Sequence, residues 1–209
     1  MMNQAVKKNL FKTLRVILIV LICIFLVGPF IMLVSNSFKT EAEINSTIPT
    51  LIPEKPTVDS FSEIFRDKAF MVNMFNSFIV SIITMLIAMC IALPASYAIV
   101  RIRMRITKYL QGWILLSQMI PGIILIIPLY LILMRMGLTN THVGLIIVYA
   151  VWSLPFSIWM MRGFIGGLSN EIEEAAFIDG CNLGRMFVKI LFPLLLPGIL
   201  TAGIFAFIL

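Results

Sequence analysis

The stretch from residue 69 to residue 100 reads AFMVNMFNSFIVSIITMLIAMCIALPASYAIV and contains no Asp, Glu, Lys or Arg. A helix needs about 20 mainly apolar residues to cross the hydrocarbon core of a bilayer, which is about 30 Å thick. This run is therefore long enough to span a membrane. Four further uncharged runs share its composition, over residues 16–38, 109–134, 136–161 and 190–209. The sequence predicts five membrane-spanning helices.

The composition of the whole chain supports this prediction. Hydrophobic residues make up 60% of the 209 residues and charged residues 12%, and the mean hydropathy is +1.04. A soluble domain of this length could not bury so much apolar surface. A membrane barrel would need strands of alternating hydrophobicity, which these runs lack. We expect an all-α, polytopic helical membrane protein.

The Lys and Arg residues predict its orientation. If the N-terminus is cytoplasmic, eleven of the 16 cations lie on the cytoplasmic side, and the short segment Arg101–Lys108 carries four of them without an acid. Cytoplasmic loops carry such an excess, so the net charge of +6 indicates membrane topology and not nucleic-acid binding. The expected parts are a cytoplasmic segment 1–15, a first span 16–38, a periplasmic loop 39–72 and a core 73–209 with a cytoplasmic loop 162–189.

Two features of the outer side add expectations. Residues 60–70 have apolar side chains at helical spacing and predict a short amphipathic helix, which either lies at the membrane interface, contacts an outer partner, or packs on the bundle. The last run stops at Leu209 with no polar or basic residue after it. Because spans are normally anchored at both ends, we expect a C-terminally truncated chain and a sixth span beyond it.

The cytoplasmic loop contains a predicted short helix. Ser169 or Asn170 can cap its start, and with Asn170 as the cap Glu173 occupies the position of a capping box. Gly180, preceded by Asp179, lies where a left-handed residue would end the helix. A second helical stretch over residues 183–191 leads back to the membrane.

One side of this helix is apolar and small. Ile172, Ala175 and Ala176 recur at helical spacing and predict a flat strip that a partner backbone could approach closely. The alternative is a connection lying on the lipid surface. An interfacial anchor usually has large apolar residues opposite many cations, which this segment lacks.

The spans offer polar residues but no central charge. A proton-coupled carrier would need a titrating group at mid-span, so this pattern disfavours one. Neutral polar side chains suit an uncharged, hydroxyl-rich solute, and they equally suit hydrogen bonds between helices. The candidates are Ser77, Ser81, Thr84, Ser96, Tyr97, Gln111, Ser117, Gln118, Ser153 and Ser157.

Prolines predict where spans bend. Pro94, Pro121, Pro128 and Pro155 lie inside apolar runs and should bend or locally unwind them. Gly122 follows Pro121, which makes this pair the candidate hinge, as either a static kink or a moving joint. No phosphate-binding glycine loop, catalytic motif or metal-ligand spacing is present in the sequence, so we expect no enzymatic activity.

Glu174-Ala175-Ala176, then Gly180 and Ile190-Leu191-Phe192-Pro193, resemble the EAA loop of binding-protein-dependent ABC transporter permeases. The wider match is to the MalG-like carbohydrate permease group and covers nearly the whole chain. Two departures are Ser169, where the family usually has Pro, and Phe192, where it usually has Leu. Supporting stretches are Pro29-Phe30, Asn36 to Lys39, Asn76-Ser77, Ala98 to Arg101, Pro128 to Tyr130 and Leu154 to Phe156.

The resemblance implies the transmembrane domain of a type I ABC importer in the cell membrane. Such a subunit forms half of a pathway, here for a carbohydrate, together with a second permease, a cytoplasmic ATPase dimer that binds ATP and Mg, and a solute-binding protein. The chain itself would bind no cofactor or metal. The alternatives are a permease for another small solute and a non-transporting membrane scaffold. The implied ATPase-coupling residues are Glu173, Glu174, Ala175, Ala176, Asp179 and Gly180.

Overall fold

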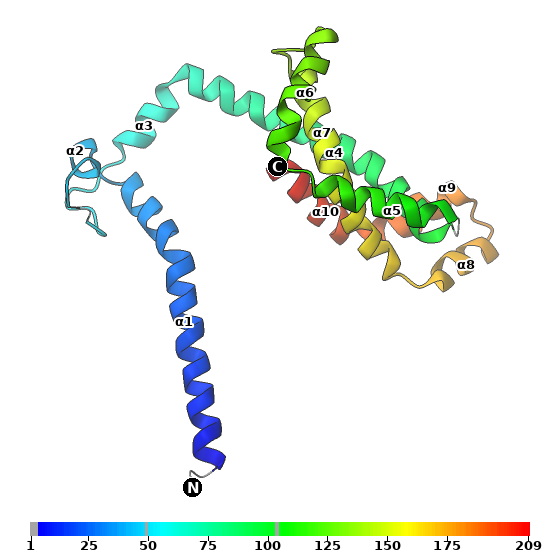
Figure 1. Cartoon of the computed structure of the whole chain (residues 1–209), viewed down its shortest axis with the longest axis horizontal. Coiled ribbons are helices and arrows are strands. Elements are labelled where there is room, and N and C mark those ends of the chain that lie inside the picture. The colour runs from blue at the N-terminus through cyan, green and yellow to red at the C-terminus, as the bar shows by residue number, and fades with distance from the viewer. Residues whose placement is uncertain (1–3, 49, 103–104) are drawn as a thin grey trace. The chain divides into compact units, whose positions relative to one another are not determined.

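The computed structural model describes residues 4–48, 50–102 and 105–209, with side chains from residue 11 onward. Arg103, one of the cations used to predict the orientation, lies outside the described residues, as do the side chains of Lys7 and Lys8. Within the described ranges all regular structure is helical, which confirms the predicted fold class (Figure 1). The chain forms two compact units, Met1–Asn73 and Met74–Leu209.

The first unit is built on one long apolar helix. Helix α1 (Gln4–Ser37) contains an apolar segment, Phe11–Ser37, of which no part is buried within the chain. Its exposed side chains need lipid as their solvent, as the predicted first span requires. Helix α2 (Glu41–Ile44) and helix α3 (Asp59–Arg66) follow.

Polar contacts fold the segment between these helices. The Lys39 ammonium is buried, and it donates hydrogen bonds to the side-chain oxygen of Asn36 at 2.9 Å and to the carbonyl of Thr50. Glu43 Oε1 accepts from the hydroxyl of Thr50 at 2.9 Å and from the backbone N–H of Glu54 at 3.0 Å. These bonds close the segment into a defined loop.

The predicted amphipathic helix over residues 60–70 is correct only in its first part. Helix α3 ends at Arg66, because the carboxylate of Asp67 accepts from the backbone N–H groups of Ala69 at 2.9 Å and Phe70 at 3.3 Å and so begins the next helix. Phe61 of α3 packs against Phe38, with ring centroids 5.6 Å apart.

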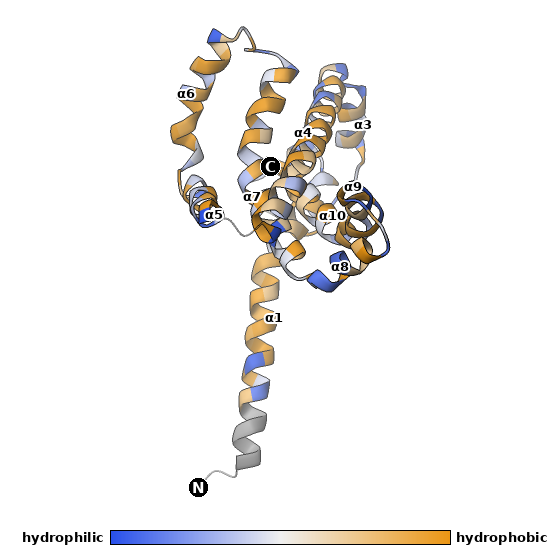
Figure 2. Ribbon diagram, turned by 90° about the vertical axis from the view of Figure 1, so that its right-hand side faces the viewer, coloured by the Kyte–Doolittle hydropathy of each residue, from blue (hydrophilic) through white to orange (hydrophobic). Residues whose placement is uncertain are grey.

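The second unit contains three long apolar helical segments. They are α4 (Lys68–Arg101), whose first residues belong to the first unit, α7 (His142–Gly166), and a continuous stretch made of α9 (Leu183–Met186), the π-helix η1 (Phe187–Leu191) and α10 (Phe192–Ile208). Figure 2 shows hydrophobic residues along α7 and α10 and hydrophilic residues in α8 (Asn170–Ile178) at one end of the unit. The membrane-facing and polar parts are therefore separated.

Small residues let these helices approach closely. A Cβ atom added to Gly198 of α10 would lie 2.5 Å from the ring of Phe164 on α7. Gly203 of α10 lies against Met85 of α4, where an added Cβ would be 3.5 Å from the side chain. Association of helices in lipid depends on such close packing. Lipid tails are as apolar as the side chains, so the hydrophobic effect does not drive the helices together. The buried core residues include Ala88, Ala92, Met161, Ile165, Leu191, Leu195, Ala202 and Ala206.

The predicted third span is broken. Helix α5 (Arg105–Gln118) and helix α6 (Gly122–Arg135) meet at 98°. The described residues therefore hold four helices that could span a membrane, or five if this bent pair counts as one span. The break lies at Pro121, the N-terminal cap of α6, which confirms the predicted bend there. The other prolines, Pro94, Pro128 and Pro155, do not interrupt their helices.

Candidate functional site

Helix α8 is a short helix with defined ends. The side chain of Ser169 caps it by accepting from the backbone N–H of Glu171 at 3.2 Å. At the other end Gly180 has a φ of +81°, as the sequence predicted. The N–H of Gly180 bonds to the carbonyl of Phe177 at 3.1 Å, and the N–H of Cys181 bonds to the carbonyl of Ala176 at 3.0 Å. This pair of bonds is a Schellman motif, which ends the helix sharply.

The inner side of α8 is held by an ion pair. Glu173 is 8% exposed, and its Oε1 lies 2.5 Å from Nε of Arg101 at the end of α4. Its Oε2 accepts from the hydroxyl of Tyr97 at 2.8 Å. Arg101 Nη2 also donates to the carbonyl of Leu168, which precedes α8, at 3.0 Å. The predicted capping box at Glu173 is therefore wrong, since this carboxylate bonds to α4.

The ion pair also corrects the predicted apolar strip. Glu173 and Ala176 lie one helical turn apart, so turning Glu173 inward buries Ala176, which is 2% exposed. Ile172 is half-buried, and of the three predicted strip residues only Ala175 faces outward. The exposed residues of α8 are instead Asn170, Glu171, Glu174, Ala175, Phe177 and Ile178, and its C-terminal cap Asp179 is exposed as well.

The chain returns to the membrane through a second capped helix. The side chain of Asn182 accepts from the N–H of Arg185 at 2.8 Å and so starts α9. The predicted helix over residues 183–191 is confirmed, but its second half is the π-helix η1. Phe187 of η1 meets the ring of Tyr97 edge-on, with centroids 5.5 Å apart. The loop therefore has two helical arms, α8 and the returning stretch of α9 and η1, and Tyr97 contacts both of them.

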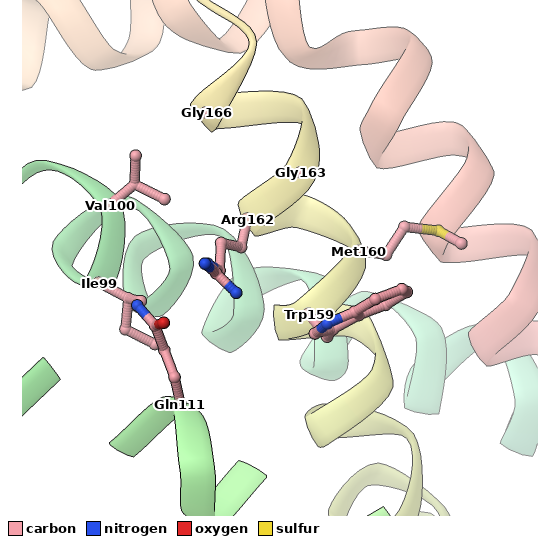
Figure 3. Close-up of a pocket in the computed structure, with 8 residues that line it drawn as sticks. All are labelled: Ile99, Val100, Gln111, Trp159, Met160, Arg162, Gly163 and Gly166. Carbon is pink, nitrogen blue, oxygen red and sulfur yellow. The ribbon is translucent and has the colours of Figure 1, made fainter. Parts of the chain in front are cut away.

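Two cavities adjoin this end of the unit. One, of about 730 Å³, lies between the end of α4 and the two arms of the loop, and its lining includes Tyr97, Arg101, Glu173, Phe177 and Phe187. The other has a volume of about 560 Å³. In Figure 3 Gln111 of α5 and Arg162 of α7 point into it from different helices. Its other lining residues are Ile99, Val100, Trp159, Met160, Gly163 and Gly166.

The candidate pathway residues fall into different environments. Gln111 lines a cavity, as does Tyr97. Ser96 and Ser153 are fully buried and donate to carbonyls of their own helices, to Leu93 at 2.9 Å and to Ala150 at 3.2 Å. Buried serines of this kind serve helix packing. Within the described part of the chain, the side chains of Thr84 and Ser157 are also buried.

Arg101 was not predicted as a site residue from the sequence. In the sequence Arg101 served as a topology signal and as part of the family-like stretch Ala98 to Arg101, and Tyr97 was a pathway candidate, although both side chains bind Glu173. No local signal links them, because 72 residues separate Arg101 from Glu173. In the described part of the chain, no group of three His, Cys, Asp or Glu side chains has the arrangement of a metal site.

Comparisons with known proteins place this fold in a family. A family model described as "binding-protein-dependent transport system inner membrane component" matches residues 92–209. The putative ABC transporter permease protein ORF1 of Streptomyces antibioticus is 38% identical over 157 residues, which cover 75% of this chain and 69% of that protein. The trehalose transport system permease protein SugB of Mycobacterium tuberculosis is 34% identical, with 86% and 65% covered.

Another relative, whose name refers to a sugar, and one solved structure are also similar to this chain. The diacetylchitobiose uptake system permease protein DasC of Streptomyces coelicolor is 31% identical, with 90% of this chain and 68% of that protein covered. The crystal structure of a bacterial ABC transporter involved in the import of alginate contains a chain with the same fold. It matches with a TM-score of 0.80 at 22% identity, over 97% of this chain and 71% of that one.

The chain thus spans 65% to 69% of the length of these three relatives. The family model covers more than half of the 209 residues, including both arms of the loop around α8. The family match and the several apolar helices together show that the chain is a multi-pass membrane protein. It belongs to the family of binding-protein-dependent transport system inner membrane components.

Proposed function

We propose that this chain is a permease subunit of an ATP-driven importer and that α8 couples it to a cytoplasmic ATPase. The observation that carries the proposal is the two-sided character of α8. Its inner side is fixed to α4 through Glu173, and its outer side is exposed. A helix held in this way can transmit a displacement from a soluble partner to the spans. Family membership supports this assignment.

The outer side of α8 defines the partner surface. Ile178, the last residue of α8, is 86% exposed, Ala175 is exposed one turn before it, and the carboxylates of Glu171, Glu174 and Asp179 are exposed as well. Such a surface suits a cleft with an apolar floor and a basic rim. The ATPase dimer would bind ATP and Mg in its own sites, and this chain would bind no cofactor.

We assign the transported solute to the carbohydrates. The names of the relatives from M. tuberculosis and S. coelicolor refer to trehalose and diacetylchitobiose, and that of another relative, from Agrobacterium fabrum, to sulfoquinovosyl glycerol. The cavity in Figure 3 combines the amide of Gln111 with the indole of Trp159, groups that suit hydroxyl-rich rings. A second permease would complete the pathway, and a solute-binding protein would deliver the sugar.

The orientation follows from the cation distribution. With the N-terminus in the cytoplasm, the Arg101–Lys108 segment and α8 lie on the ATPase side of the cell membrane. The loop between α1 and α4 then faces the solute-binding protein.

Co-purification tests the proposal. The tagged chain, expressed with the transport genes that neighbour its own, should recover an ATPase subunit, and the complex in proteoliposomes should take up sugar only with ATP. Glu174→Lys should reduce ATPase recovery, whereas Glu63→Lys on the exposed surface of α3 should not. A wild-type chain that recovers no ATPase and moves no solute would favour a membrane scaffold and overturn the proposal.

A further inference from the structure

We propose that Glu173 is a positioning residue that makes α8 and α4 move as one body. In this proposal Glu173 links α8 to α4, and its neighbour Glu174 contacts the ATPase. The side chain of Glu174 is exposed and available to a partner, whereas that of Glu173 is buried against α4. This inference rests on the proposed function and adds to it the internal link that carries the displacement. We call the three side chains Tyr97, Arg101 and Glu173 the α4–α8 tie.

The tie holds α8 at more than one point. Both oxygens of Glu173 are bonded, one to Arg101 Nε at 2.5 Å and the other to the Tyr97 hydroxyl at 2.8 Å. Arg101 also binds the carbonyl of Leu168 at 3.0 Å, so it fixes the chain before α8 as well as its first turn. Because two residues of α4 hold both Glu173 and the carbonyl of Leu168, a shift of α8 on α4 would break at least one of these bonds.

The tie also reaches the returning arm. Tyr97 contacts Phe187 of η1 edge-on at 5.5 Å, while its hydroxyl binds Glu173. The last turn of α4 is therefore joined to both arms of the loop. A displacement of α8 by a partner would act on α4 and on the stretch that continues into α10.

Because the Arg101–Glu173 ion pair in the α4–α8 tie is largely buried, separating its two charges costs free energy. The side chains of Arg101 and Glu173 are 14% and 10% exposed, and each would leave a poorly solvated charge if the other withdrew. Among the described residues, Glu173 is the only buried carboxylate. A surface ion pair would give way easily, but a buried pair with further hydrogen bonds resists separation.

Paired substitutions separate the two glutamates. Glu173→Gln should leave the ATPase bound and hydrolysing ATP but lower sugar uptake per ATP by about tenfold, within the range that coupling free energies span. Glu174→Gln should instead weaken ATPase recovery. Tyr97→Phe removes one hydroxyl and should give a smaller loss than Glu173→Gln. Equal loss of ATPase recovery in both glutamate variants would overturn the division of roles.

A chemical bridge tests whether the tie stays closed during transport. Arg101→Cys with Glu173→Cys, in a chain whose Cys23, Cys90 and Cys181 are replaced by Ser, can be joined by a short bifunctional thiol reagent. The bridged complex should recover the uptake per ATP that the unbridged variant has lost. If bridging blocks uptake, α8 and α4 must separate during the cycle and the proposal is wrong.

A final readout does not depend on the ATPase. Hydrogen exchange of the α8 amides in the purified chain should be faster in Glu173→Gln than in wild type and unchanged in Glu174→Gln. Unchanged exchange in Glu173→Gln would show that Glu173 does not hold α8. Absence of ATPase binding by the wild-type chain would count against the proposed function, and this exchange result would still decide the tie.

Discussion

Gly122, the first residue of α6, lies directly against the indole of Trp152 on α7. A Cβ atom at Gly122 would be 2.1 Å from Cη2 of that ring. The start of α6 can approach α7 this closely only without a side chain. The contact therefore fixes the direction in which the chain leaves the 98° break after α5.

Gly122→Ala should destabilise the protein by about 1–3 kcal/mol, the usual cost of overpacking. Trp152 is 38% exposed, so its ring can relieve part of the clash by shifting, at the expense of the direction of α6. Thermal unfolding of the purified complex measures the loss, and sugar uptake measures the effect on the pathway.

Gly112→Ala is the matched control for this substitution. Gly112 lies in α5, and nothing lies within 4 Å of an added Cβ there. Replacing a helical Gly by Ala in open space should stabilise by up to about 1 kcal/mol. Equal effects of Gly112→Ala and Gly122→Ala would show that the contact with Trp152 does not constrain α6.

The break at Pro121 could be predicted from the sequence only in part. Apolar runs predicted the spans, because hydropathy is a local property. A proline alone does not decide the outcome, since the chain breaks at Pro121, which Gly122 follows, whereas the helix continues through Pro128. The contact of Gly122 with Trp152 could not be predicted in this way, because the two residues lie far apart in the sequence.

Gly180→Ala should weaken the loop around α8. Gly180 has a φ of +81°, a conformation that costs a residue with a Cβ about 1–2 kcal/mol. The change should increase protease cleavage after α8 and reduce ATPase recovery, and Gly180→Asn should do less harm because Asn tolerates this region better. Gly184→Ala, in α9 and without positive φ, should behave as wild type. Equal sensitivity of the two Ala variants would contradict the role of the Schellman motif.

Ser169→Ala should loosen the start of α8. Loss of an N-terminal cap costs about 0.5–2 kcal/mol, and the hydroxyl of Ser169 accepts from the N–H of Glu171. Hydrogen exchange at the first turn of α8 measures the loss. Ser169→Asp keeps an acceptor and should restore protection; if both variants exchange alike, the cap is dispensable.

The local features of α8 were predictable, but its rotation was not. Ser169 and Gly180 act on neighbouring backbone groups, so their residue types predicted both helix ends. The direction of Glu173 depends on Arg101, which lies 72 residues earlier. A periodic pattern shows which residues share a side of a helix, and only the distant partner shows which side faces inward.

The loop between α1 and α4 should respond to acid through Glu43. The backbone N–H of Glu54 holds the pKa of the Glu43 carboxyl below its ordinary value, with further help from the Thr50 hydroxyl, the Lys55 N–H and the Lys39 charge, although desolvation opposes them. A lowered folded-state pKa stabilises the loop at pH values above the ordinary pKa, and this stabilisation is lost as the pH falls through the folded value. An NMR titration of Glu43 in the detergent-solubilised chain measures this pKa.

Thr50→Val tests whether the hydrogen bond from the Thr50 hydroxyl lowers the pKa of Glu43. Removing the hydroxyl that bonds Oε1 at 2.9 Å should raise the Glu43 pKa toward its ordinary value and make the loop more sensitive to pepsin at acidic pH. Glu43→Gln should remove the acid dependence altogether. An acid response that persists in Glu43→Gln would assign it to another group.

Thiol labelling decides the side of the membrane on which α8 lies. In a chain with Cys23, Cys90 and Cys181 replaced by Ser, a cysteine at Ile178 is accessible because that position is 86% exposed, and one at Ile52 is accessible because that position is 76% exposed. A membrane-impermeant maleimide should label Ile52→Cys in intact cells and Ile178→Cys only after the membrane is opened. This pattern follows from the four cations between Arg101 and Lys108, which favour the cytoplasm. Labelling of Ile178→Cys in intact cells would put α8 out of reach of any ATPase, whereas the contacts of the α4–α8 tie would be unaffected.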